Sequence, residues 1–203
     1  AKYAAKVPAS IWTPDRVETR IGTLKFSDGR PDDETVKKVY DQLDFGRGVE
    51  AFMSGMPAAS VYAICEGLDR AGVKPNQGIG VTDELGDART LFLTLNTATV
   101  YAWFCLDLKD GPVVVEIPPG ILGFVDDAAY RFLTDVGFVG RDQGKGGKYL
   151  FVPPDYKGAL PKDGYFVSQS PTYSNYVMYR SFVENGDIAA AARNIKASAR
   201  VYP

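Results

Sequence analysis

The sequence predicts an α+β, mainly β fold: a jelly-roll-like sandwich or barrel with an N-terminal helical region and a C-terminal helix. Between residues 79 and 180, short apolar runs alternate with turns rich in Gly, Pro and Asp, which is typical of many short strands. Helical spacing of apolar residues is confined to the two ends of the chain. The 12 tyrosines and 11 phenylalanines also favour strands.

Residues 1–75 are expected to form a helical region with short breaks that packs on the core. Pro31 is followed by three acidic residues, which is typical of a helix start. The apolar spacing continues as one stripe through Val36, Val39, Tyr40 and Leu43. A second helical region is expected over about 49–71, split or kinked at Pro57 and ended by Gly72. Its side chains available to the core are Phe52, Met53, Met56, Val61, Ile64 and Leu68.

Residues 76–203 are expected to form the β-rich domain. The expected strands are 79–85, 90–95, 100–108, 113–117, 132–139, 149–152, 165–169 and 176–180. Their close spacing favours a sandwich, jelly roll or barrel over alternating β-α units. A small-residue apolar face then predicts the terminal helix, with Asn185 or Asp187 as its N-cap.

Composition excludes several classes of function. The net charge of −2 and pI near 5.3 argue against a nucleic-acid partner, which requires a basic face. No apolar run approaches the roughly 20 residues that span a membrane. The chain has no histidine, which removes histidine-based nucleophilic catalysis and the commonest transition-metal ligand. A zinc site is therefore not expected, and no metal ligand and no cofactor is assigned from the sequence. Cys65 and Cys105, both among apolar neighbours, are expected to be buried free thiols rather than a disulfide.

A polar segment near the middle of the chain is the first candidate site. Alternation along an extended strand places Thr97, Thr99 and Tyr101 on one face, with Asn96 beside them. If this face lines a barrel mouth, the hydroxyls converge on a polar ligand. If it faces solvent, they are ordinary strand residues.

The second candidate is a set of carboxylates, Asp107, Glu116, Asp126, Asp127 and Asp135, which could also hold a hard cation through oxygen ligands. Glu116, Asp126 and Asp127 are the candidate catalytic acids, since two facing carboxylates can perform acid–base chemistry on a phosphate or glycosidic ester. The structural alternative is that the two aspartates cap a short helix beginning near residue 128. In that alternative Glu116 pairs with a basic side chain, for which the candidates are Arg131, Arg141 and Arg180.

The glycine-rich segment 140–149 is the third candidate. The P-loop motif requires Gly-Lys followed by Ser or Thr at a helix start, but Gly146 follows Lys145 here, so a nucleotide P-loop is excluded. A loop that binds an anion through its amides and through Lys145, Lys148 or Arg141 stays open, but a tight structural turn is favoured.

Longer phrases of the sequence indicate a family. The segments LFLTLNTATVY, DGPVVVEIPPGILGFVDD and GRDQGKGGKYLFVPPDYKG are the most specific, and the resemblance extends into ETRIGTLKFSDGRPDDETVKKVYDQLDF near the N-terminus. The chain resembles the bacterial family called domain of unknown function 1254. Its members usually carry a companion, domain of unknown function 1214, which would follow Pro203. The resemblance implies a periplasmic or secreted protein whose signal peptide has been removed, with β-rich, jelly-roll-like units. It implies no reaction.

One residue departs from the family pattern. The family usually has Asn-Thr-Asp-Thr-Val-Tyr where this chain has alanine at position 98. The missing carboxylate is either a lost functional group or a lost turn cap, and the turn cap is favoured because Asx side chains commonly bond to turn backbone.

Three functions are carried forward. The leading hypothesis is the N-terminal portion of an exported two-domain protein that binds a small polar or anionic ligand, or its companion domain. The residues assigned to this site are Asn96, Thr97, Thr99, Tyr101, Arg141, Lys148 and Arg180. The alternatives are a carboxylate-dependent hydrolase, with or without a metal ion, and an assembly module of the cell envelope that forms a homo-oligomer.

Overall fold

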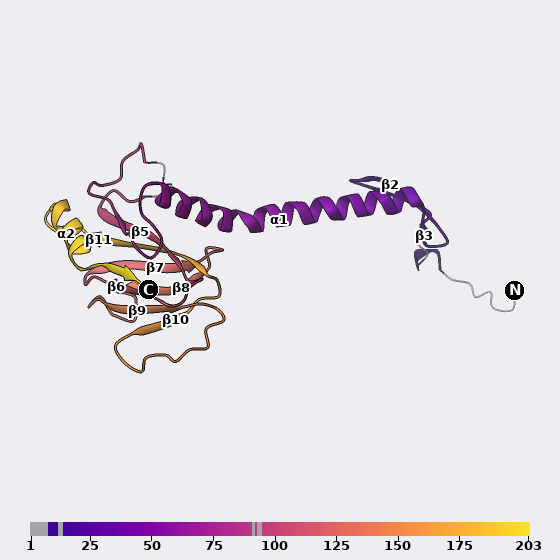
Figure 1. The fold of residues 1–203 in the computed structure, drawn as a ribbon. Coiled ribbons are helices and arrows are strands. Elements are labelled where there is room, and N and C mark those ends of the chain that lie inside the picture. The colour runs from indigo at the N-terminus through magenta and orange to yellow at the C-terminus, as the bar shows by residue number, and fades with distance from the viewer. Residues whose placement is uncertain (1–7, 12–13, 91, 93–94) are drawn as a thin grey trace. The chain divides into compact units, whose positions relative to one another are not determined.

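The computed structural model describes residues 8–11, 14–90, 92 and 95–203 (Figure 1). The chain divides into two compact units, Ala1–Gly55 and Met56–Pro203. A long helix, α1 (Asp33–Arg70), contributes its first part to one unit and its last part to the other. A short 3-10 turn, η1 (Ala9–Ile11), precedes the first strand.

The first unit contains strands that the sequence did not predict. β1 (Arg16–Thr19), β2 (Gly22–Ser27) and β3 (Arg30–Pro31) form an antiparallel sheet in that order. A helical region with short breaks was expected here, and that interpretation was wrong for these residues. The turn between β2 and β3 uses Asp28 and Gly29, both at positive φ, which suits a tight hairpin.

The start and end of α1 agree with the sequence, but its continuity does not. Asp32 Oδ1 accepts the Thr35 amide at 2.7 Å, and Gly72 follows the helix at φ +91. The helix nevertheless runs unbroken through Pro57 for 38 residues. A proline removes one amide donor, and the helix formers Ala58 and Ala59 that follow it sustain the conformation.

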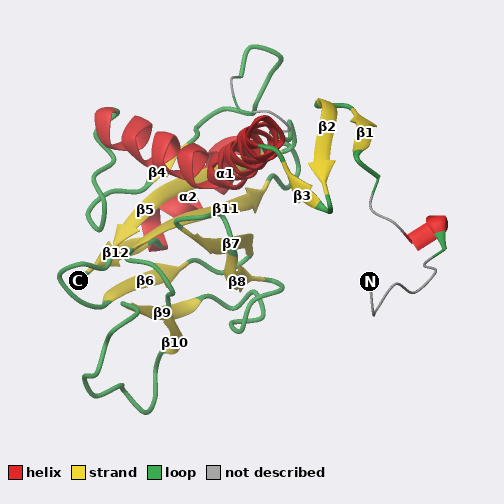
Figure 2. Cartoon of the chain, turned by 90° about the vertical axis from the view of Figure 1, so that its right-hand side faces the viewer, coloured by secondary structure: helices red, strands yellow, loops and turns green. Residues whose placement is uncertain are grey.

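The second unit contains two sheets, and the α+β, mainly β class is confirmed. One sheet has the order β4-β5-β11-β7-β8 and the other the order β10-β9-β6-β12. In chain order the elements are β4 (Gly80–Val81), β5 (Thr99–Asp107), β6 (Val113–Ile117), β7 (Ile121–Asp127), β8 (Phe132–Gly137), β9 (Gly147–Val152), β10 (Phe166–Gln169), β11 (Ser174–Phe182), α2 (Ile188–Ser198) and β12 (Arg200–Tyr202). Figure 2 shows the two sheets as successive layers, with the last turns of α1 outside the five-stranded one.

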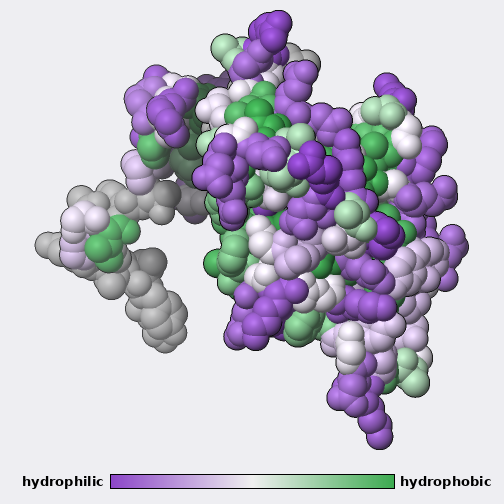
Figure 3. Space-filling view, turned by 90° about the vertical axis from the view of Figure 1, so that its left-hand side faces the viewer, coloured by the Kyte–Doolittle hydropathy of each residue, from purple (hydrophilic) through white to green (hydrophobic). Residues whose placement is uncertain are grey.

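The core lies between the two sheets. Phe104 of the five-stranded sheet, Val115 and Tyr149 of the four-stranded sheet, and Ile195 of α2 belong to one buried apolar cluster. Asp187 is the N-cap of α2 and is one of the two residues, Asn185 and Asp187, that the sequence offered for this role. On the face of this unit seen in Figure 3, hydrophilic side chains cover most of the surface, in keeping with apolar side chains enclosed in the core.

Some strands differ from the expectation. β7 and β12 were not predicted, and the expected strand over 79–85 is present only as the two residues of β4. The expected strand over 90–95 falls partly outside the described residues, since 91, 93 and 94 are not described. No helix begins near residue 128: Asp126 and Asp127 end β7, and a turn leads into β8. No helix among the described residues is long and apolar enough to cross a membrane.

Cys65 and Cys105 form a disulfide, so the expectation of two free thiols was wrong. Alternation along β5 turns Cys105 to the face opposite the core, where Val61 of α1 packs with it. Helical spacing brings Cys65 to the same side of α1 as Val61, and the two cysteine Cα atoms lie 5.8 Å apart. Sequence spacing contains no information about this approach, because the two cysteines belong to different elements.

Candidate ligand-binding site

The outer face of the five-stranded sheet places side chains from three strands in rows. Cross-strand register aligns Tyr101 of β5 with Arg180 of β11, and Arg180 with Leu122 of β7. The next row is Trp103, Met178 and Phe124, and the one after it is Cys105, Tyr176 and Asp126. Side chains directly opposite one another have Cβ atoms about 4.5–5.5 Å apart. This face therefore brings basic, acidic and aromatic groups together on a rigid platform.

A hollow of about 340 Å³ opens beside the first row and is called here the Arg180 hollow. Tyr101, Phe124, Asp135 and Arg180 are among the residues that line it. Arg180 is half-buried, and its guanidinium makes no hydrogen bond or ion pair within the described part of the chain. A half-buried guanidinium that makes no ion pair is a natural binding group for an anion, and the Asp135 carboxylate that also lines the hollow lies beyond ion-pair distance.

A larger groove of about 1060 Å³, called here the aromatic groove, lies between the last turns of α1 and the same sheet face. Its sheet side is formed by Phe92, Trp103 and Tyr130, and its helix side includes Ala63 and Gly67. The Phe92 and Trp103 rings are stacked, with centroids 5.0 Å apart and planes inclined by 7°. The lining is mostly apolar, which is typical of small-molecule sites.

The Tyr101 ring connects the two hollows. It stacks on Trp103 with ring centroids 5.5 Å apart, so the wall of the Arg180 hollow and the wall of the aromatic groove are in contact. The buried Trp103 Nε1 has no hydrogen-bond partner among the described residues. Because this atom is also out of contact with solvent, Trp103 contributes ring surface rather than a hydrogen-bond donor to the groove.

Asp126 and two tyrosines form an acidic cluster next to the groove. Tyr130, a groove residue, stacks on Tyr176 with ring centroids 6.2 Å apart, and the buried Tyr176 hydroxyl has no hydrogen-bond partner in the described part of the chain. Burial, and then the nearby Asp127 and Asp135 carboxylates, raise the pKa of Asp126. Burial likewise raises the pKa of both tyrosines. The neutral, proton-bearing form of each group is thus favoured.

The polar segment predicted from sequence is divided between turn and strand. Asn96 Oδ1 accepts the Ala98 amide at 2.7 Å, so Asn96 itself stabilises the turn at the position where the family carboxylate is missing. The Asn96 amide donates to the Tyr101 hydroxyl at 3.2 Å. Thr97 is exposed, whereas Thr99 is buried and its Oγ1 has no partner.

Arg141 and Lys148, also assigned to the ligand site, have partners of their own around the four-stranded sheet. Arg141 donates to the Val167 carbonyl and to Ser168 Oγ at 3.0 and 2.6 Å. Lys148 lies on β9 and makes an ion pair with Glu116 at 3.2 Å. The structure therefore brings Tyr101 and Arg180 together and holds Arg141 and Lys148 elsewhere.

Two of the three candidate acids are likewise engaged. Glu116 accepts the Tyr202 hydroxyl at 2.7 Å, and hydrogen bonds from Tyr202 and Lys148 lower its pKa. Its partners are thus a tyrosine and a lysine rather than one of the three arginines proposed. Burial acts to raise the pKa of Asp127, but hydrogen bonds from the Arg131 amide and guanidinium hold it below its usual value. Asp126 is the candidate acid whose carboxyl has no hydrogen bond or ion pair within the described ranges.

The glycine-rich segment is a structural turn around Asp142. This buried carboxylate accepts the Gly137 amide at 2.8 Å, the Gly146 amide at 3.1 Å and the Tyr149 hydroxyl at 2.6 Å. Within the segment, the Gly146 amide therefore points at a carboxylate of the chain, and the Gly140, Gly144 and Lys145 amides donate to backbone carbonyls.

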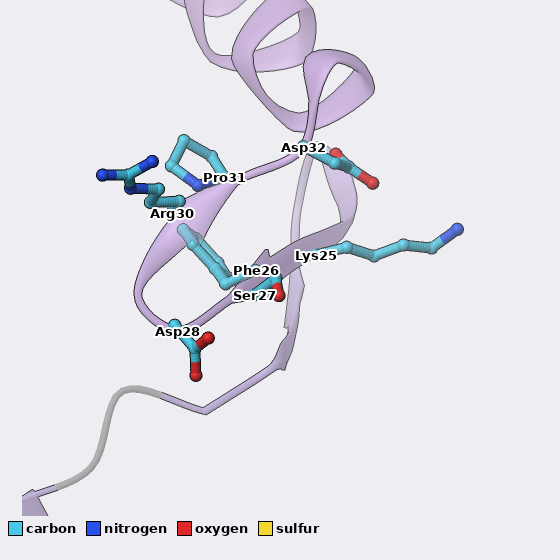
Figure 4. Close-up of a pocket in the computed structure, with 7 residues that line it drawn as sticks. All are labelled: Lys25, Phe26, Ser27, Asp28, Arg30, Pro31 and Asp32. Carbon is cyan, nitrogen blue, oxygen red and sulfur yellow. The ribbon is translucent and has the colours of Figure 1, made fainter.

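A separate hollow of about 800 Å³ lies in the first unit, over the β2–β3 hairpin. Figure 4 shows that its charged side chains, among them Lys25, Asp28 and Arg30, point away from one another. They do not converge on a ligand. No cluster of three or more Asp, Glu or Cys side chains able to hold a metal ion occurs in the described parts of the chain.

Sequence reasoning missed Phe92, Trp103, Tyr130 and Tyr176. The signal for Trp103 was available: the alternation that places Thr99 and Tyr101 on one face also places Trp103 there. Tyr130 and Tyr176 come from different strands and turns, and only the pairing of β11 with β7 brings them together.

Comparison with known proteins adds the family. Residues 75–203 match the family described as "Protein of unknown function (DUF1254)". The chain belongs to this family. The match begins at residue 75, so the resemblance of the N-terminal segment and the DUF1214 companion domain stay predictions. No curated protein matches the chain.

Among solved structures, the DUF1254 chain is similar to the VPA0106 protein from Vibrio parahaemolyticus, with a TM-score of 0.56 and 18% identity. The similarity covers 75% of this chain and 36% of that chain, so this chain spans little more than a third of its relative. At this identity the likeness shows the fold alone.

Proposed function

We propose that this DUF1254 protein binds a small anionic ligand in the Arg180 hollow. The observation that carries the proposal is the half-buried Arg180 guanidinium, which lines a cavity of about 340 Å³ and makes no ion pair or hydrogen bond with the described residues. An anion that enters this hollow meets a cation already partly removed from water, so their attraction is stronger than at the open surface.

Tyr101 is the second binding group. Its hydroxyl oxygen accepts the Asn96 amide, which leaves the hydroxyl proton free to donate to the same anion. Asp135 of β8 also lines the hollow, and its carboxylate disfavours ligands with several negative charges. The chemistry therefore favours a monoanion, such as a carboxylate.

The disulfide supports export of the protein. Disulfides persist in oxidising compartments such as the periplasm and are rare in the cytosol. The Cys65–Cys105 bridge thus favours the periplasmic or secreted location that the family resemblance implies.

The test is calorimetric titration of the protein with acetate and benzoate as monoanionic probes. Wild type is expected to bind at least one of them with unit stoichiometry, and Arg180→Gln is expected to weaken binding at least tenfold. Arg47→Gln is the matched control, because it removes one positive charge from an exposed helix surface in the other unit. Equal affinity of wild type and Arg180→Gln would refute the proposal.

A second candidate function is assembly with another copy of the chain. The part of α1 in the first unit exposes large apolar side chains, among them Tyr40, Leu43, Phe45, Phe52 and Met53. Exposed apolar surface of this kind commonly marks a protein interface. Light scattering after size exclusion tests the idea: Phe45→Ser with Phe52→Ser should convert an oligomer to a monomer, and a monomeric wild type contradicts it.

A further inference from the structure

We propose that the Arg180 hollow and the aromatic groove are one site, and that its ligand is an amphiphilic monoanion with an apolar body. The proposal rests on the proposed function and adds the chemical class of the ligand: the head group binds Arg180, and the body lies along the groove.

The two hollows are close enough to hold one molecule. Arg180 and Met178 are two residues apart on β11, which is about 6.7 Å along a strand. Tyr101 and Trp103 are the equivalent pair on β5, and their rings are stacked at 5.5 Å. Arg180, Met178 and Tyr101 line the hollow, and Trp103 lines the groove. A carboxylate and the first few carbons attached to it span this distance.

Small side chains on α1 leave the space of the groove open, and its helix side offers few polar groups. Ser60, Ala63 and Gly67 recur at helical spacing and line its helix side. A methyl group added at Gly67 would meet no atom within 4 Å. The Ser60 hydroxyl is already donated to the Met56 carbonyl at 2.9 Å, so the helix side offers mainly carbon to a ligand.

The sheet side of the groove adds aromatic surface. Phe92 and Tyr130 are partly exposed there, and burying them against an alkyl or aryl body removes apolar surface from water. No Lys, Arg, Asp or Glu is among the groove's lining residues, so the charge of the ligand must be met at Arg180.

A small molecule fits these dimensions better than a protein segment. The groove, at about 1060 Å³, is at the upper end of the volumes that enclose small ligands. The Cys65–Cys105 bridge lies beside it and fixes α1 to β5, which holds the two walls at a constant distance. A fixed width suits a flat or narrow body.

The experiment compares octanoate, acetate and octanol by calorimetric titration of the wild-type chain. Octanoate is expected to bind at least about tenfold more tightly than acetate, the effect of burying about two methylene groups. Octanoate is also expected to bind at least tenfold more tightly than octanol, and this second difference should vanish in Arg180→Gln.

Groove variants supply the second arm. Gly67→Phe fills the groove and is expected to reduce octanoate affinity at least tenfold while leaving acetate affinity unchanged. Gly67→Ala is the matched control, since it keeps the groove open and favours the helix. Circular dichroism tests whether both variants fold. If Gly67→Phe does not fold, the comparison of octanoate, acetate and octanol on the wild-type chain decides the question by itself.

The outcomes separate the two proposals. Equal affinity for octanoate and acetate, both dependent on Arg180, overturns the amphiphile and leaves the anion site standing. Equal affinity for octanoate and octanol, both insensitive to Arg180→Gln, overturns the anion site and with it the shared head group. Absence of binding by all three probes overturns both.

Discussion

The disulfide is a covalent cross-link between α1 and β5 in addition to the backbone, and its removal should have a large and calculable effect. The bridge joins residues separated by 40 positions, and the chain-entropy relation for a loop of that length gives about 4 kcal/mol of stabilisation. For a chain of 203 residues this corresponds to a melting temperature lower by about 8–16 °C. The segment most affected is the end of α1, because Val61, Ile64 and Leu68 are its main other anchors on the sheet.

Thermal and urea unfolding of wild type and of Cys65→Ala with Cys105→Ala measure this difference. Wild type treated with a reducing agent should approach the double variant, and the reducing agent should leave the double variant unchanged. Mass spectrometry after alkylation under non-reducing conditions should find no free thiol in wild type. A fully alkylated wild type, or a double variant with unchanged unfolding midpoint, would show that the bridge is not formed or not stabilising.

Three further substitutions test individual parts of the fold. Burial raises the pKa of Asp126 in the folded state. The folded protein is therefore most stable, relative to the unfolded chain, below the unfolded pKa of about 3.9, where the Asp126 carboxyl is protonated in both states, and it loses stability as pH rises through the raised folded pKa. Asp126→Asn should stabilise the protein at neutral pH by on the order of 1 kcal/mol, and denaturation profiles below about pH 4 should show no gain. Asp142→Ala should cost about 3 kcal/mol in urea unfolding, because two amides and a tyrosine hydroxyl lose a buried acceptor, and a loss under about 1 kcal/mol would contradict this assignment. Gly137→Ala should lower the free energy of unfolding by more than about 3 kcal/mol, since Gly137 has φ +81 and a Cβ there would collide with the Ile121 carbonyl. Gly186→Ala is the control: Gly186 has φ +76 but lies in open space, so the loss should be only about 1 kcal/mol. Equal losses would refute the steric argument.

Local chemistry explains which elements the sequence could predict. Strands such as β5 and β6 were predictable because their apolar runs are bounded by turn residues, and α2 because Asp187 caps a small-residue stripe. β7 was missed because the glycine within it and the paired aspartates at its end resemble a turn and a helix cap. The continuity of α1 was missed because a proline inside a helix is usually, but not always, a break.

The candidate site shows the same division. Tyr101 and Arg180 were singled out from sequence as hydrogen-bonding and basic residues, but so were Arg141 and Lys148, and sequence offers no way to separate the two pairs. The structure separates them through pairing: β11 lies beside β5, so Arg180 meets Tyr101, while Arg141 and Lys148 bond elsewhere. Trp103 became a candidate only when the structure placed its ring in the wall of the groove, stacked on Phe92 and Tyr101.

The sequence by itself determined the family, the mainly β class, the ends of the helices and the exclusion of histidine chemistry, because each depends on residue identity or on spacing along one element. The tertiary structure decided the disulfide, the unpartnered Arg180 and the groove beside it. These depend on which strands pair and on where α1 crosses the sheet. Such contacts join residues far apart in the chain, and no periodicity of the sequence records them.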